Sequence, residues 1–169
     1  SLCHFLRHRR QLRQHAPTEN VSSSQSMNNI LMKKITVTIT VDIPKEIAWE
    51  YWNDLKHIPH WSFATPEWGA ESIENNLQAK GHFKHRMFAK DGSASFYFEG
   101  AYTLVEPHQR IEYTLTDGRN VSVLFEDVNG STRITESFDP EHENSEEMQR
   151  AGWQAFLENF KKYAEESKR

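Results

Sequence analysis

The stretch that decides the fold of this chain is FEGAYTLVEPHQRIEYTLTDGR, residues 98–119. It holds two segments in which apolar and polar residues alternate, separated by EPHQ (106–109) and followed by DG (117–118). Alternation with a period of two predicts strands that bury one face, and the Pro and Gly signals predict turns. The sequence therefore predicts strands over 95–106 and 110–117 that pair as an antiparallel hairpin.

The same pattern continues on both sides of this hairpin. KKITVTITVD (33–42) places isoleucine and valine on one face and threonine on the other. DGS (91–93) and NG (129–130) supply turns between neighbouring segments. Further strands are predicted over 70–77, 81–89, 120–128 and 131–138. Together these segments predict a curved antiparallel sheet of about seven strands.

Two short helices are expected between the first two strands. Pro44 can occupy the first turn of a helix, and Pro59 ends any helix that reaches it. The apolar stripe of the first helix is expected at Ile47, Tyr51 and Leu55, with Ala48 and Trp52 alongside. WSFATPEWG (61–69) is expected to form an irregular loop that carries aromatic residues.

A long helix is expected near the C-terminal end of the sequence. Asn144 and Glu147 match a capping box, and the helix continues to about residue 166. Its apolar stripe is expected at Met148, Trp153, Phe156, Phe160 and Tyr163. One long amphipathic helix can cover the concave face of a curved sheet, so the expected fold class is α+β, in a single domain over residues 33–169.

Charge is distributed unevenly along the chain. Residues 1–26 carry four arginines and one glutamate, which leaves 16 basic and 23 acidic residues in the remainder. Such an acidic body argues against nucleic-acid binding, which needs a basic surface. No segment has the length and hydropathy of a membrane-spanning helix, so no membrane span is predicted.

Residues 1–32 form a basic, serine-rich segment that we expect to be a disordered extension. Two origins are open for residues 1–26. They are an organelle transit peptide, which is typically rich in Arg and Ser, or translated upstream sequence, with Met27 or Met32 as the natural start. The single cysteine, Cys3, allows no disulfide within the chain. This composition favours a cytoplasmic protein.

Several stretches carry a family resemblance. They are IPKEIAWEYWND (43–54), RMFAKDGS (86–93), FEGAYTLVEPHQRIEYTLTDGR (98–119), TRITESFDPE (132–141) and EMQRAGWQAFLENFKKYAE (147–165). Over residues 33–166 the chain resembles the helix-grip (SRPBCC) superfamily, which includes START lipid-transfer domains, birch-pollen-allergen-like proteins and polyketide cyclase-like proteins. It is most similar to small stand-alone relatives of the C-terminal domain of the heat-shock-protein-90 ATPase activator. Tyr97 departs from this pattern, because we expect an acidic or small polar residue there.

The resemblance implies a helix-grip fold, in which a curved sheet grips a long C-terminal helix, and it leaves the function open among three classes. The main hypothesis is non-catalytic binding of an apolar or aromatic small molecule or lipid in a cavity under the helix. One alternative is a chaperone-associated stress-response protein that acts through interaction. The other is a cyclase- or aromatase-like enzyme. The expected state is a monomer or a homodimer.

The turns also predict which residues face each other across the strands. The predicted pairs are Met87–Phe96, His85–Phe98, Phe83–Gly100, Leu115–Val121, Tyr113–Val123, Ile111–Phe125, Phe125–Ile134 and Val123–Glu136. Members of these pairs share one face of the sheet. Because that face is apolar, we expect it to be concave and to lie under the long helix. Lys84 and Glu99 are expected opposite each other on the other face.

Two polar residues on this concave face are candidates for chemistry. Glu136 lies between Ile134 and Phe138, where a carboxylate needs a partner or a raised pKa. For Glu136 and His85 two roles are open. Each is either a structural residue that is hydrogen-bonded to a neighbour, or a residue that contacts a ligand or moves a proton. No catalytic residue is assigned beyond these two candidates.

Two glycines suggest where a ligand could lie. Gly100 and Gly152 either allow close packing or leave a pocket between them, with Trp52, Trp61, Phe63 and Trp68 at its mouth. The expected ligand-binding residues are Trp52, Trp61, Phe63, Trp68, Phe83, His85, Met87, Phe96, Phe98, Gly100, Tyr102, Tyr113, Val123, Glu136, Met148, Gly152, Trp153 and Phe156.

The sequence offers no metal or cofactor motif. No histidine pair shares a strand face with a carboxylate at ligand spacing. The glycine-rich phosphate loop, the dinucleotide-binding GxGxxG and the nucleophile motif GxSxG are all missing. We therefore predict neither a metal nor a cofactor.

Overall fold

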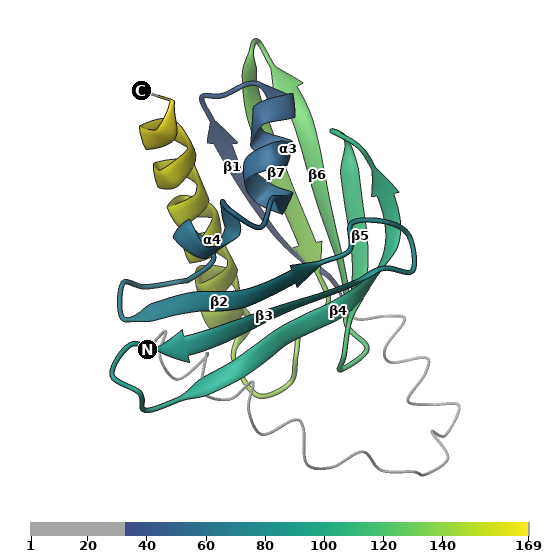
Figure 1. The fold of residues 1–169 in the computed structure, drawn as a ribbon. Coiled ribbons are helices and arrows are strands. Elements are labelled where there is room, and N and C mark those ends of the chain that lie inside the picture. Colours follow the sequence, from purple (N-terminus) through teal and green to yellow (C-terminus); the bar gives the residue numbers. More distant parts are fainter. Residues whose placement is uncertain (1–32, 169) are drawn as a thin grey trace, which may run out of the picture.

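Seven antiparallel strands form one curled sheet in the computed structural model, which describes residues 33–168 (Figure 1). The strands are β1 (Ile35–Val41), β2 (Trp68–Asn75), β3 (His82–Ala89), β4 (Ser95–Glu106), β5 (Arg110–Leu115), β6 (Asn120–Val128) and β7 (Ser131–Phe138). Their order across the sheet is β1-β7-β6-β5-β4-β3-β2, so only β1 leaves the sequential meander. The predictions for residues 1–32, including those on Cys3 and the two methionines, lie outside the described residues.

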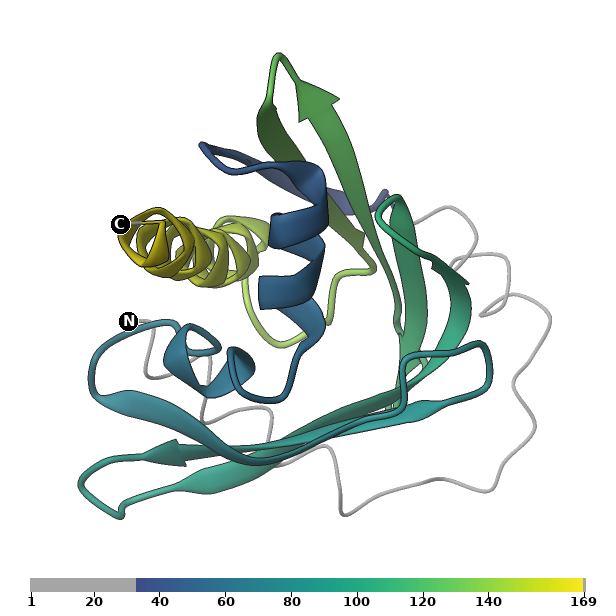
Figure 2. The same ribbon diagram turned by 45° about the horizontal axis from the view of Figure 1, so that its top comes forward.

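The helices occupy the hollow of this sheet. They are α3 (Lys45–Asn53), the 3-10 helix η2 (Ile58–His60) and α4 (Glu146–Ser167). Figure 2 shows the sheet turning around them, with β2, β3 and β4 as one wing and β6, β7 and β1 as the other. This arrangement confirms the expected α+β helix-grip fold. No helix within residues 33–168 is long and apolar enough to cross a membrane.

Most of the predicted strand register is confirmed. Phe83 faces Gly100 and His85 faces Phe98 across β3 and β4, and Lys84 faces Glu99 on the other side of the sheet. The β6–β7 pairs also agree, with Val123 opposite Glu136. Because side chains alternate between the two faces, these registers set which residues meet the helices.

The predicted β5–β6 register is wrong by two residues. Tyr113 faces Val121 instead of Val123, and Ile111 faces Val123. The reason is a shorter loop, in which Leu115 N–H donates to the Arg119 carbonyl at 2.8 Å and Gly118 adopts a φ of 89°. Such a three-residue loop needs a residue in the left-handed region. A shift of two keeps every side chain on its predicted face.

The buried face of α3 differs from the predicted stripe. Ala48 is buried as expected and Trp49 is also buried, whereas Ile47 is 36% exposed. Leu55, which is 50% exposed, lies beyond the end of the helix. Trp49 packs edge-on against Phe125 of β6, with ring centroids 5.3 Å apart. Burying the larger indole removes more apolar surface from water than burying Ile47 would, so it sets the rotation of the helix.

Two element boundaries also differ from the sequence predictions. β2 begins at Trp68, inside the segment that was expected to be an irregular loop, because Trp68 pairs with Ala89 of β3. At α4 the predicted capping box, which begins at Asn144, is one residue too early. Ser145 is the N-cap, and its hydroxyl accepts from the Met148 backbone N–H at 3.1 Å.

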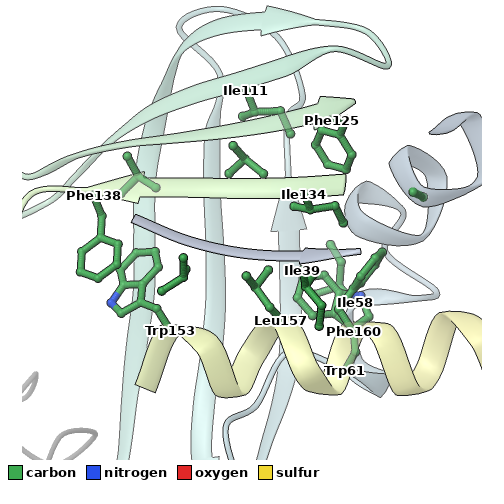
Figure 3. Close-up of a cluster of buried hydrophobic side chains, with 14 of the residues drawn as sticks. Ile39, Ile58, Trp61, Ile111, Phe125, Ile134, Phe138, Trp153, Leu157 and Phe160 are labelled. Carbon is green, nitrogen blue, oxygen red and sulfur yellow. The ribbon is translucent and has the colours of Figure 1, made fainter. Parts of the chain in front are cut away.

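A large part of the core lies between α4 and the β1–β7–β6 wing of the sheet (Figure 3). Trp153 stacks on Phe138, with ring centroids 4.0 Å apart and an interplanar angle of 12°. Leu157 and Phe160, one and two turns further along α4, are fully buried. Because α4 packs against this wing, space is left between the helices and the other wing.

Candidate functional site

A cavity of about 90 Å³ lies between the helices and the concave face of the sheet. Strands β3, β4 and β5 supply eight of the 17 lining residues, and α3, η2 and α4 close the opposite side. The lining residues are Trp52, Asn53, Ile58, Trp61, Ser62, Asn75, Phe83, His85, Met87, Phe96, Phe98, Tyr102, Ile111, Tyr113, Glu136, Trp153 and Phe156.

Twelve of the residues expected to bind a ligand line this cavity. The other six do not line it: Phe63, Trp68, Gly100, Val123, Met148 and Gly152. Val123 and Gly152 are buried, so they belong to the core around the cavity. The strand residues were found because period-two alternation places them on one face.

The wall on the β3–β5 side is built around the ring of Phe83. Its centroid lies 4.9 Å from that of Tyr113, 5.3 Å from that of Tyr102 and 5.6 Å from that of Phe98. These separations are within the range in which aromatic pairs attract each other. The rings form one continuous apolar surface, and Tyr102 and Tyr113 add a phenol group each.

Gly100 does not leave a gap in this wall. A Cβ atom at Gly100 would lie 2.5 Å from the Thr114 carbonyl oxygen and 3.0 Å from Cζ of Phe83. The ring of Phe83 therefore occupies the space above the glycine, as close packing requires. Of the two interpretations that the sequence left open for Gly100, the structure supports close packing.

The predicted aromatic mouth is not a single feature. Trp52 and Trp61 pack together, with centroids 4.7 Å apart, and each lies 5.0 Å from the ring of Phe160 in α4. Trp68 packs instead against Phe96, at 5.8 Å. Trp52 and Trp61 thus join the α3–η2 segment to α4 and border the cavity from that side.

His85 projects into the cavity from the middle of β3. Its ring contacts those of Phe83 and Phe98, with centroids 5.8 Å and 6.0 Å away. The Nδ1 atom is buried and has no hydrogen-bond partner within residues 33–168. Burial lowers the pKa of His85 to about 4, because the apolar surroundings disfavour the charged imidazolium.

Glu136 faces the same cavity from β7. It is 4% exposed and is flanked across the sheet by Val37 and Val123. Its side chain and that of His85 come from different wings of the sheet and border the same cavity because the sheet curls. The cavity thus brings together the two polar candidates that the sequence placed on one face.

A polar chain at the edge of the cavity was not predicted. The Tyr102 hydroxyl donates to Oδ1 of Asn75, and Nδ2 of Asn75 donates to the Asn53 carbonyl at 2.9 Å. Burial raises the pKa of Tyr102, so the phenol stays protonated at neutral pH. Asn75 faces Phe83 across β2 and β3, and the pairing of these two strands would have revealed it. The sequence did not indicate that Asn53, Ile58 and Ser62 line the cavity, because only packing of the α3–η2 segment brings them there.

The cavity suits an uncharged, mainly apolar molecule. Aromatic rings supply most of the wall, and few polar groups converge on it. No lysine or arginine among the described residues lines the cavity. Within the same part of the chain, no group of three or more His, Cys, Asp or Glu could hold a metal ion.

Comparisons with known proteins agree with this fold. The family model described as Activator of Hsp90 ATPase homolog 1-like protein matches residues 42–165. The solution structure of the AHSA1-like protein from Aeromonas hydrophila is 38% identical, with a TM-score of 0.74 over 79% of this chain and 94% of that chain. Chr148 from Cytophaga hutchinsonii is 48% identical, with a TM-score of 0.70 over 79% of this chain and 93% of that chain.

A more distant structure, from Chromobacterium violaceum, shares the fold at 17% identity, with a TM-score of 0.71 over 79% of this chain and 98% of that chain. The comparison with curated proteins gave no match. The family model covers well over half of the chain, and two solved structures above 30% identity align over nearly their whole lengths. The chain therefore belongs to the family of Activator of Hsp90 ATPase homolog 1-like proteins, within the helix-grip superfamily.

Proposed function

We propose that this protein binds an apolar or aromatic small molecule in the cavity between the curled sheet and α4, without transforming it chemically. The observation that carries the proposal is the composition of the cavity wall, in which aromatic rings surround a few inward-facing polar groups. Small-molecule sites generally have this character. The family's fold commonly binds hydrophobic ligands, which supports the same function.

The volume of the cavity limits the size of the ligand. An engineered apolar cavity of about 150 Å³ is large enough for benzene. The cavity described above measures about 90 Å³, so a long lipid chain would have to displace part of the wall. Phe96, Phe98 and Phe156 are half-buried and can move outward more easily than the buried Phe83. We therefore favour a compact ligand over a lipid.

Native mass spectrometry of freshly purified protein tests this function. We expect an additional small-molecule mass that is lost on denaturation, and a rise in Tm when the molecule is added back. Phe156→Trp enlarges a half-buried ring in the wall and should reduce binding. Tyr97→Trp is the matched control, because Tyr97 is 40% exposed outside the cavity, where Nζ of Lys84 lies 4.2 Å from its ring centroid. A ligand-free mass together with no thermal response to small aromatic compounds would contradict the proposal.

The description of the matching family favours a second candidate, which is activation of the Hsp90 ATPase through direct contact. This candidate rests on the family match alone. Titrating the protein against Hsp90 and its isolated middle domain, with ATP turnover as the readout, separates the two functions. Stimulated turnover would support the chaperone role. Unchanged turnover together with a co-purified ligand would support the binding role.

A further inference from the structure

We infer that the ligand of this cavity is uncharged, is close to a single ring in size, and places a hydroxyl group against Nδ1 of His85. This inference rests on the proposed binding function and specifies the chemistry of its ligand. It draws on the hydrogen bonding, the charges and the volume of the cavity.

The first observation is that His85 has an unused hydrogen-bonding atom. Its Nδ1 is buried without a partner among the described residues. Leaving a buried polar atom unpaired is unfavourable, and native proteins rarely do so. The neighbouring Asn75 and Asn53 show the usual situation, since the side-chain amide of Asn75 donates to the Asn53 carbonyl and that of Asn53 donates to the Trp49 carbonyl. A ligand group that bonds to Nδ1 of His85 would give this atom the partner that it lacks.

The second observation identifies this group as a hydroxyl. Burial keeps the imidazole of His85 neutral at neutral pH, so Nδ1 is an acceptor in one tautomer and a donor in the other. A hydroxyl group both donates and accepts, and it therefore pairs with either tautomer. The imidazole packs against the rings of Phe83 and Phe98. Its Nδ1 is covered by neighbouring atoms, so the ring has to turn about its Cβ–Cγ bond to present this nitrogen to the ligand.

The third observation excludes an anionic ligand. Within residues 33–168, no lysine or arginine lines the cavity, and the buried Glu136 lies in the same wall. A carboxylate or phosphate placed there would lose its hydration without gaining a cation. The cavity volume of about 90 Å³ is smaller than the roughly 150 Å³ of a cavity that binds benzene, so even a single neutral ring needs a small outward movement of the wall, and a larger ligand needs more.

Phenol and toluene form a matched pair of probes, because they have nearly the same shape and differ in the hydroxyl group. Calorimetric titrations of the full chain at pH 7 should show phenol binding about tenfold more tightly than toluene. Benzoate, an anion of similar size, should not bind detectably. In His85→Phe the preference for phenol should disappear, because the ring is kept and the nitrogen is lost. In His82→Phe, an exposed position on the same strand, the preference should remain.

A measurement on the unmodified protein keeps the test independent of whether His85→Phe folds. The ¹⁵N chemical shift of His85 Nδ1 should change on addition of phenol and stay constant on addition of toluene. Equal binding of the two probes, or a preference that survives in a folded His85→Phe protein, would overturn the inference and leave the binding function standing. No binding of either probe and no co-purified ligand would overturn the binding function itself, and the inference with it.

Discussion

At the scale of single residues, His85 and Gly100 set the properties of the cavity wall. His85 lies on β3 opposite Phe98 of β4, and Gly100 lies on β4 opposite Phe83 of β3. His85 brings a neutral, hydrogen-bonding nitrogen into an apolar surface. Gly100 allows the ring of Phe83 to lie directly over the backbone. His85 supplies a hydrogen-bonding group, and Gly100 supplies room for the ring of Phe83. A separate prediction follows for each of the two residues.

The stability of the protein should depend on the protonation of His85. Its pKa is about 4 in the folded protein and 6.5 in a model peptide, so the unfolded chain takes up the proton first as the pH falls. The contribution of His85 to stability is therefore full above pH 6.5 and decreases toward pH 4, by up to about 3 kcal/mol. Urea unfolding of the wild type and of His85→Phe at several pH values measures this. A constant difference between the two proteins from pH 7 to pH 4 would contradict the prediction.

Gly100→Ala should destabilise the fold by about 1–3 kcal/mol, because the added methyl group would overlap the Thr114 carbonyl and the ring of Phe83. The carbonyl belongs to the β4–β5 pairing and cannot move away cheaply. Thr103→Ala, on the exposed face of the same strand, is the control and should change little. Chemical denaturation gives both values. An unchanged midpoint for Gly100→Ala would mean that the wall yields more easily than the packing indicates.

At the scale of elements, the long helix α4 does more than cover the core. β1 is an edge strand of the sheet, and its outward carbonyl groups accept hydrogen bonds from α4 side chains. Arg150 donates to Thr36 at 2.6 Å, Gln154 to Thr38 at 3.2 Å and Lys161 to Thr40 at 2.6 Å. These bonds occupy an edge that could otherwise pair with another chain. The opposite edge, β2, is interrupted by a bulge between Glu71 and Glu74.

Removing the three α4 donors should destabilise the protein and expose the β1 edge. The triple change Arg150→Ala, Gln154→Ala and Lys161→Ala should lower the free energy of unfolding by about 1–3 kcal/mol, since each bond contributes modestly at a partly exposed site. Sedimentation should also show concentration-dependent association. Lys162→Ala, an exposed position on the same helix, is the control. A triple variant as stable and as monodisperse as this control would show that these hydrogen bonds do not protect the β1 edge.

At the scale of the whole molecule, the two wings of the sheet have different tasks. The β1–β7–β6 wing packs against α4, as the stacking of Phe138 of β7 on Trp153 of α4 shows. The β2–β4 wing curls away from α4, and the cavity lies between them. A fold that packs one wing fully can leave room beside the other without losing its stability.

Residues 33–169 should therefore fold without the preceding segment. The buried hydrophobic residues of the described chain run from Ile35 to Ala164, and nearly all of them form one cluster. We expect the chain shortened to residues 33–169 to unfold within about 2 °C of the full chain in a thermal melt. A fall of about 5 °C or more would show that residues 1–32 contribute to the fold.

Local sequence patterns were enough to predict the fold and most of the cavity wall. Alternation and turn signals placed the ends of all seven strands within two residues, and parity assigned Phe83, His85 and Glu136 to one face. Parity is robust because the β5–β6 register error, a shift of two, left every residue on its face. The family resemblance then supplied the helix over that face, and the solved relatives confirm it.

Only the tertiary structure decided how the space inside the fold is filled. Whether Gly100 leaves a gap depends on the rotamer of Phe83, and the buried face of α3 depends on how Trp49 fits against Phe125. The Asn53–Asn75 contact joins segments that are distant in the sequence. Local patterns encode which face is apolar, because that depends on neighbours along the chain. They do not encode which side chains meet across the fold, because that depends on packing among elements brought together only after folding.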